Sequence, residues 1–159
     1  MILFLDFDGV LHPDGFKYPV TDFRYFHLLP RLESLLRLHP HVRIVISSLW
    51  RLRMELQQLR AIFSRDICDR VIDTTPLPLR FDDAIYILDF REREIVRWLE
   101  ANGGIDQPWV ALDDAPFLHH VDRLVPCEPL VGFDEGAERA LRRHFEAGLP
   151  GRPASGTDP

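Results

Sequence analysis

The sequence predicts one α/β domain built as three layers, with a parallel sheet between two layers of helices. Two observations support this class. Short apolar runs of strand length alternate with amphipathic segments of helical period along the 159 residues. Polar residues follow several of these runs directly, at the sheet edge where open parallel sheets bind ligands. The predicted domain covers residues 1–147, and the stretch 148–159, rich in Gly, Pro and small polar residues, is expected to be disordered.

Four apolar runs are the predicted strands, at residues 2–5, 42–46, 84–88 and 109–112. Their lengths and apolar composition are typical of strands that are buried on both faces. Because amphipathic segments separate most of them, we expect the strands to run parallel.

Four amphipathic segments are the predicted helices, at residues 30–38, 51–63, 91–101 and 135–147. The second has the clearest period, with apolar side chains at steps of four, three and four: Leu52, Leu56, Leu59 and Phe63. The third is followed by Asn-Gly-Gly at 102–104, which is a helix stop signal.

The composition is that of an ordinary soluble protein, with 46% hydrophobic and 28% charged residues. Its two cysteines, Cys68 and Cys127, lack the spacing of a zinc site or a disulfide framework, so we expect a cytoplasmic protein. No apolar run approaches transmembrane length, which predicts no membrane association. A net charge of −6 argues against nonspecific binding to nucleic acid, although arginine clusters could still contact phosphates.

Four groups of polar residues occur in order along the chain, each at a predicted strand end or helix start. Asp6 and Asp8, with Gly9 after them, follow the first strand, and the later groups are Ser47-Ser48, Arg91 and Asp113-Asp114. Magnesium prefers hard oxygen ligands, which carboxylates from two strand ends supply. Hydroxyl and guanidinium groups would hold the oxygens of a phosphate. The pattern therefore predicts a magnesium-dependent phosphoryl-transfer site.

Each group alone also has an ordinary structural interpretation. Ser48 could cap the helix that follows it, and this role is compatible with phosphate binding. The Asp113-Asp114 pair could cap a turn before Pro116, but adjacent carboxylates repel each other without a cation. The adjacent His119 and His120 lack metal-ligand spacing and are interpreted as surface residues.

Taken in order, these groups resemble the pattern of the haloacid dehalogenase (HAD) superfamily of phosphohydrolases and phosphotransferases. More narrowly, the segments 3–12, 45–51, 91–99 and 110–114 look like the HAD domain of multidomain RNA-repair proteins. The resemblance implies a Rossmann-like HAD core. The intervals in which this superfamily inserts cap domains are short here, so we expect a capless or minimally capped core with an open site, completed by a large substrate or a partner.

The resemblance also implies a role for each residue. Asp6 would be the nucleophile that forms an aspartyl-phosphate, and Asp8 the general acid and base. The magnesium would be held by the side chains of Asp6 and Asp113 and by the backbone carbonyl of Asp8. Asp114 would support this site from behind these ligands.

The phosphate would be held by Arg91 and a serine hydroxyl, with Ser48 preferred over Ser47. Arg51, next to the serines, is a candidate contact for the substrate. Phosphorylated polynucleotide ends are the candidate substrate. A small-metabolite phosphatase or phosphotransferase and a catalytically silent binding module remain alternatives, and the oligomeric state is open.

Overall fold

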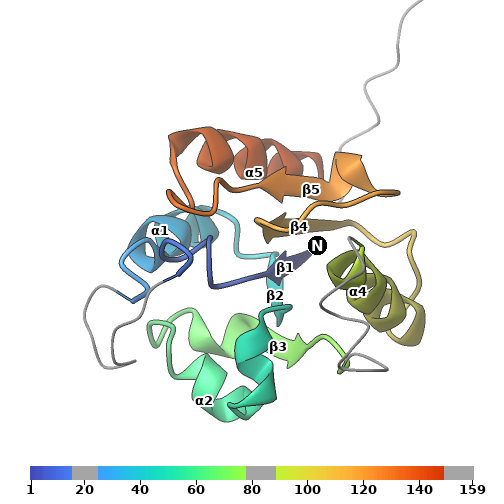
Figure 1. The fold of residues 1–159 in the computed structure, drawn as a ribbon, viewed down its shortest axis with the longest axis horizontal. Coiled ribbons are helices and arrows are strands. Elements are labelled where there is room, and N and C mark those ends of the chain that lie inside the picture. Colours follow the sequence, from blue (N-terminus) through green and yellow to red (C-terminus); the bar gives the residue numbers. More distant parts are fainter. Residues whose placement is uncertain (16–24, 78–88, 149–159) are drawn as a thin grey trace, which may run out of the picture.

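A five-stranded parallel sheet forms the centre of the computed structural model, which describes residues 1–15, 25–77 and 89–148 (Figure 1). The strand order is β3-β2-β1-β4-β5, and each described pair runs parallel. The strands are β1 (Ile2–Leu5), β2 (Arg43–Ile46), β3 (Val71–Thr74), β4 (Trp109–Asp113) and β5 (Leu124–Pro126). The predicted parallel α/β class is confirmed.

The three central strands match the prediction, whereas the two edge strands do not. β1, β2 and β4 are buried almost throughout and were visible as apolar runs. β3 has one buried residue of four and β5 one of three, so neither has the continuous apolar run of a central strand. The strand predicted at 84–88 lies outside the described residues.

Three of the four predicted helices are present: α1 (Leu29–Leu38), α4 (Phe90–Ala101) and α5 (Glu135–Ala147). The continuous helix predicted over 51–63 is wrong. The chain forms a 3₁₀ turn, η1 (Leu49–Leu52), and then a separate short helix, α2 (Leu56–Arg60). Glu55 is extended and is the N-cap of α2, with its N–H donating to Gln58 Oε1 at 2.8 Å. The apolar period does mark buried side chains, Leu59 and Phe63, but it runs across the break between η1 and α2.

The helices cover both faces of the sheet, as predicted, because alternate strand residues face opposite sides. On one face, Leu3 and Leu5 of β1 belong to a large core cluster with apolar residues of α1, α2 and α5. On the other face, Phe4 packs edge-on against Trp98 of α4 and Trp109 of β4. Figure 1 shows α1 and α4 on opposite sides of the sheet.

The register of the central strands brings their carboxyl ends to one edge. Leu5 pairs with Ile46 on one side and with Leu112 on the other. The next residues continue this alignment, since Asp6 N–H donates to Leu112 O at 3.1 Å and Ser47 N–H donates to Leu5 O at 2.9 Å. Asp6, Ser47 and Asp113, which were predicted to form one site, are therefore neighbours at this edge.

Three predictions fall partly or wholly outside the described residues. The intervals where a cap could be inserted include residues 16–24 and 78–88, so the capless, open site stays a prediction. The tail at 148–159, predicted from the sequence to be disordered, falls there too, except for Gly148. Within the described ranges, no helix combines the length and the apolar character needed to cross a membrane.

Candidate active site

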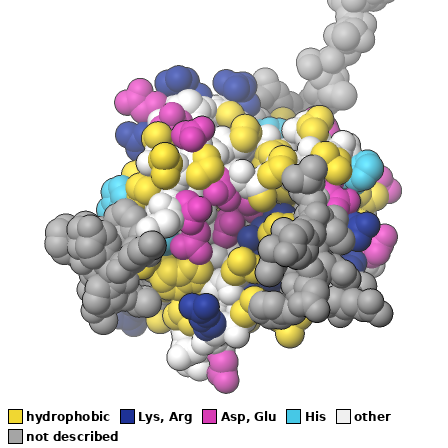
Figure 2. Space-filling view, in the orientation of Figure 1, with side chains coloured by type: hydrophobic (Ala, Val, Ile, Leu, Met, Phe, Trp, Pro, Cys, Tyr) yellow, Lys and Arg dark blue, Asp and Glu magenta, His cyan; other side chains and the backbone are white. Residues whose placement is uncertain are grey.

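A cleft of about 310 Å³ lies at the carboxyl edge of the central strands. The residues that line it come from four separate segments of the chain: Asp6, Asp8, Asp14, Leu49, Phe90, Arg91, Asp114 and Ala115. Figure 2 shows acidic side chains gathered near the centre of this face. Of the described residues that line the cleft, Arg91 is the one cation, so the cleft is strongly acidic.

Three carboxylates at this edge could hold a metal ion together. Asp6, Asp113 and Asp114 can each offer one oxygen, and these oxygens lie within 4.8 Å of one another. Backbone N–H groups orient two of them, since Phe7 donates to Asp6 Oδ1 at 2.7 Å and Ala115 donates to Asp113 Oδ1 at 2.9 Å. Hard carboxylate oxygens in such a group suit a divalent cation such as magnesium.

The protonation of these carboxylates reflects their crowding. Burial, and then the neighbouring Asp6 carboxylate, raises the pKa of Asp113 well above its ordinary value. Burial, Asp6 and Asp14 raise the pKa of Asp114 to about 6. Both shifts persist although Arg91 is nearby, so the negative charge gathered here exceeds what that one guanidinium balances. The residues present therefore fit a divalent metal ion.

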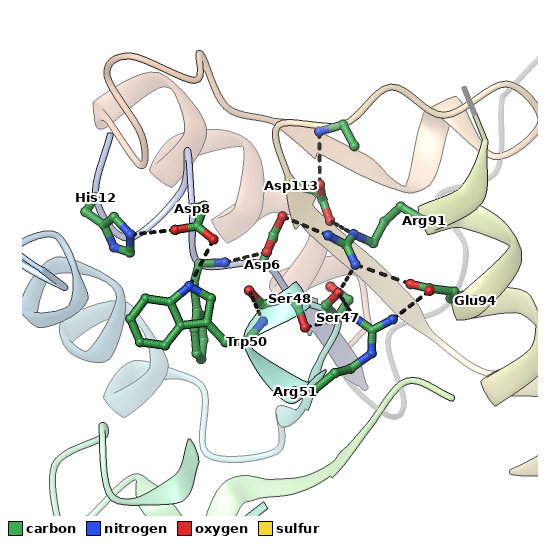
Figure 3. Close-up of polar contacts among 12 residues, drawn as sticks. Asp6, Asp8, His12, Ser47, Ser48, Trp50, Arg51, Arg91, Glu94 and Asp113 are labelled. Carbon is green, nitrogen blue, oxygen red and sulfur yellow. Dashed lines mark hydrogen bonds and ion pairs between the residues drawn. The ribbon is translucent and has the colours of Figure 1, made fainter. Parts of the chain in front are cut away.

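Arg91, at the start of α4, connects the buried carboxylates (Figure 3). Its Nη2 lies 3.2 Å from Asp6 Oδ2, its Nε 3.1 Å from Asp113 Oδ2, and its Nη1 3.2 Å from Glu94 Oε2. Nη1 also donates to the carbonyl of Ser47. Burial alone would lower the pKa of Arg91, but these carboxylates outweigh it and hold that pKa above its ordinary value. The guanidinium stays charged beside the predicted nucleophile.

Both serines that follow β2 are completely buried, and their hydroxyls differ in their partners. Ser48 has a capping role, but it caps the 3₁₀ turn η1 and not the helix predicted from residue 51, its Oγ accepting from the N–H of Trp50 at 3.4 Å. Ser47 Oγ has no hydrogen-bond partner among the described residues. Which hydroxyl would bind a phosphate stays open between the two.

Arg51 lies beneath the site rather than at its mouth. Its Nη2 is 2.6 Å from Glu94 Oε1, and its other nitrogens donate to the carbonyls of Ser47, Ser48 and Thr75 at 2.7–3.1 Å. Only 1% of the side chain is exposed, which does not support the predicted contact with substrate. The cause is local: η1 replaces the predicted helix here and turns Arg51 inward.

Asp8 lies on the other side of the cleft, away from this ion-pair network (Figure 3). Its Oδ1 is 2.9 Å from His12 Nε2, and its Oδ2 accepts from Trp50 Nε1 at 2.9 Å. Its side chain is 44% exposed. The Asp8 side chain is not part of the three-carboxylate group, which is compatible with binding a metal through its backbone carbonyl only.

Sequence reasoning assigned no role to His12, Trp50 or Glu94. His12 is four residues after Asp8, and Glu94 is three residues after Arg91, so local spacing could have suggested each contact. Trp50 gave no such signal, because it lies 42 residues from Asp8.

Gly9 allows the two sides of the site to approach each other. Its φ is +68°, a conformation that suits glycine. A Cβ at this position would lie 2.3 Å from Asp114 Oδ2. The glycine of the first motif is therefore required both by the turn and by the neighbouring carboxylate.

The buried Glu92 holds the loop that follows Asp114 against α4. Its carboxylate accepts from the backbone N–H groups of Leu118, His119 and His120 at 2.6–3.2 Å. It also lies 2.7 Å from His120 Nδ1, so this histidine has a structural partner. No metal-ligand group among the described residues includes either histidine.

A family model described as the HAD domain in Swiss Army Knife RNA repair proteins matches residues 2–137. The match spans most of the chain, and the chain belongs to this family. No curated protein matches the chain, and no solved structure does. The resemblance seen in the sequence is thereby confirmed, and family membership indicates phosphatase-like chemistry of the HAD type.

Proposed function

We propose that this HAD domain is a magnesium-dependent phosphatase that acts through an aspartyl-phosphate on Asp6. The observation that carries the proposal is the placement of the Asp6 carboxylate. It lies at the end of β1, lines the cleft, and has Arg91 on one oxygen and the Phe7 N–H on the other. A carboxylate oriented in this way can attack phosphorus.

A bound Mg²⁺ would be held by Asp6, Asp113 and Asp114, with the backbone carbonyl of Asp8, and would supply the positive charge that lets a carboxylate approach an anionic phosphate. Arg91 and the hydroxyl of Ser48 or Ser47 would bind the remaining phosphate oxygens. Arg91 suits this role because its guanidinium is charged and held rigidly by its own partners.

In the first step an Asp6 oxygen forms a bond to phosphorus while the bond from phosphorus to the ester oxygen breaks. Asp8 gives its proton to that departing oxygen, which leaves as an alcohol. In the second step a water molecule gives a proton to Asp8 and attacks the phosphorus of the aspartyl-phosphate. The bond to Asp6 then breaks, which releases inorganic phosphate and restores both carboxyl groups.

The proposed substrate is a phosphorylated end of a polynucleotide. The description of the family, which names RNA repair proteins, supports this class. The charge of the cleft also favours a terminal phosphate over an internal stretch of a polynucleotide backbone. One cation among several carboxylates can bind one phosphate, whereas a row of phosphates would be repelled. A small-metabolite phosphatase is the alternative. A silent binding module is less favoured, because both Asp6 and Asp8 are present and line the cleft.

The test compares phosphate release from 3′- and 5′-phosphorylated oligonucleotides, a phosphopeptide and small phosphate esters, each with magnesium and with excess chelator. We expect an oligonucleotide to be the best substrate, and release to require magnesium. Asp6→Asn should lower the rate on the order of 10³-fold or more, because an amide is a poor nucleophile.

The matched control is Asp106→Asn, at an exposed aspartate that is not among the residues lining the cleft. Near-normal activity of Asp6→Asn would exclude the covalent mechanism. A strong preference for a sugar phosphate would replace the polynucleotide assignment with the metabolite one.

A further inference from the structure

Two side chains that have no role in the proposed proton transfers, His12 and Trp50, hold the carboxyl group of Asp8. His12 Nε2 lies 2.9 Å from one of its oxygens, and Trp50 Nε1 donates to the other at 2.9 Å (Figure 3). An exposed aspartate ordinarily samples several rotamers. Two partners on different oxygens, from separate segments of the chain, restrict Asp8 to one orientation.

The two partners are themselves fixed by aromatic packing. The imidazole of His12 is fully buried, with ring centroids 4.9 Å from Tyr25, 5.2 Å from Phe26 and 6.0 Å from Trp50. Phe26 packs edge-on against Trp50 at 5.0 Å. The backbone of Phe26 is left-handed, with φ of 59°, which is costly for a bulky residue and persists where the surroundings enforce it. This cluster is therefore a rigid support for the His12 and Trp50 rings.

We propose that His12 and Trp50 are positioning residues that aim the Asp8 carboxyl group at the ester oxygen of the substrate. The inference rests on the proposed function, in which Asp8 transfers a proton in both steps. The described residues that line the cleft include Asp8 but neither His12 nor Trp50, so the two rings act through Asp8. Each carboxyl oxygen of Asp8 has one of these two partners and can form a further hydrogen bond. The side chain is 44% exposed, so the substrate can reach it.

This role has a consequence that a purely structural role lacks. An alkyl alcohol leaves poorly as its anion and depends on the proton from Asp8, whereas p-nitrophenolate leaves readily without one. Misplacing Asp8 should therefore slow the cleavage of an alkyl phosphate much more than that of p-nitrophenyl phosphate. A loss of folded protein would lower both rates by the same factor.

The experiment measures kcat and KM for both esters with Trp50→Phe, which keeps a ring but removes the donor. The matched control is Trp98→Phe, because Trp98 Nε1 also donates to a carboxylate, Asp73 Oδ2, at 2.6 Å in another part of the molecule. We expect Trp50→Phe to lower kcat/KM for the alkyl ester at least about 10-fold more than for the aryl ester, because kcat/KM reports the step in which the ester bond breaks, whereas hydrolysis of the aspartyl-phosphate is common to both esters. Trp98→Phe should not alter the ratio of the two rates.

A second pair of variants covers the case in which Trp50→Phe does not fold. His12→Gln keeps an N–H donor near the position of Nε2, whereas His12→Leu removes it. We expect the selective loss on the alkyl ester with His12→Leu and its partial rescue with His12→Gln.

Equal losses of kcat/KM on both esters would overturn the positioning role. Wild-type activity and its dependence on Asp6 would still leave the phosphatase proposal standing. Wild-type protein that releases no phosphate from any ester would overturn both.

Discussion

The two sides of the cleft hold their carboxylates in opposite ways. Asp8 is half-exposed and contacts the ring nitrogens of His12 and Trp50. Asp6 and Asp113 are buried and face the guanidinium of Arg91. A group that must gain and lose a proton needs access and an orientation, whereas a nucleophile or metal ligand must stay ionised and needs a fixed cation. The difference in surroundings matches the difference in proposed roles.

The buried side also extends below the cleft as a chain of alternating charges. Arg91 contacts Glu94 at 3.2 Å, and Glu94 contacts Arg51 at 2.6 Å. Burial raises the pKa of Glu94 and lowers the pKa of Arg51, so each charge depends on its partner. The Asp8 side has no comparable series among the described residues. The two sides should therefore respond differently to substitution.

The largest effect on stability is expected from Arg51→Ala. This change leaves Glu94 buried with one partner fewer and should lower the free energy of unfolding by about 3–5 kcal/mol. Denaturant unfolding measures it, with the exposed Arg53→Ala as a control that should change stability by about 0.5 kcal/mol or less. If Arg51→Ala has normal stability and raises KM for oligonucleotides alone, Arg51 contacts the substrate.

A smaller effect is expected from Gly9→Ala, at the junction of the two sides. The positive φ should cost about 1–2 kcal/mol, and the new Cβ should displace Asp114. Gly15→Ala is the matched control, because Gly15 has φ of +74° but its Cβ would meet none of the described residues within 4 Å. Thermal unfolding with and without magnesium should show that only Gly9→Ala weakens stabilisation by the ion. Equal magnesium stabilisation in both variants would remove Asp114 from the metal site.

The smallest effect is the dependence of stability on pH without magnesium. Because the pKa of Asp114 is about 6, the folded protein keeps a proton that the unfolded chain releases near the ordinary aspartate pKa of 3.8. This contribution to stability is complete below about pH 4 and is lost as the pH rises through about 6. Solvent screening of a half-buried group leaves an effect on the order of 1 kcal/mol.

Magnesium should oppose this loss, because it binds the ionised carboxylates. Melting temperatures measured at about pH 5 and about pH 7.5 should therefore rise more with magnesium at the higher pH. Asp114→Asn should flatten the pH dependence in metal-free protein. A magnesium effect of the same size at both pH values would contradict the assignment of these carboxylates.

The central sheet and the acidic edge were predictable from local patterns. Continuous apolar runs identified β1, β2 and β4, and parallel strands bring their carboxyl ends to one edge, so Asp6 and Asp113 were expected to meet. The edge strands β3 and β5 were not predictable in this way, because partial exposure removes the continuous run. The helix over 51–63 failed because an apolar period does not reveal a break such as the extended Glu55.

The sequence by itself determined which residue types stand at the ends of the central strands, since burial on both faces selects long apolar runs and the polar residues begin where that burial ends. Only the tertiary structure decided how those side chains are held. Trp50 reaches Asp8 across 42 residues and Glu94 reaches Arg51 from another element, and both contacts depend on how η1 and α4 pack beside β1. Such packing is set by the shapes and charges of distant segments together, so no local spacing records it.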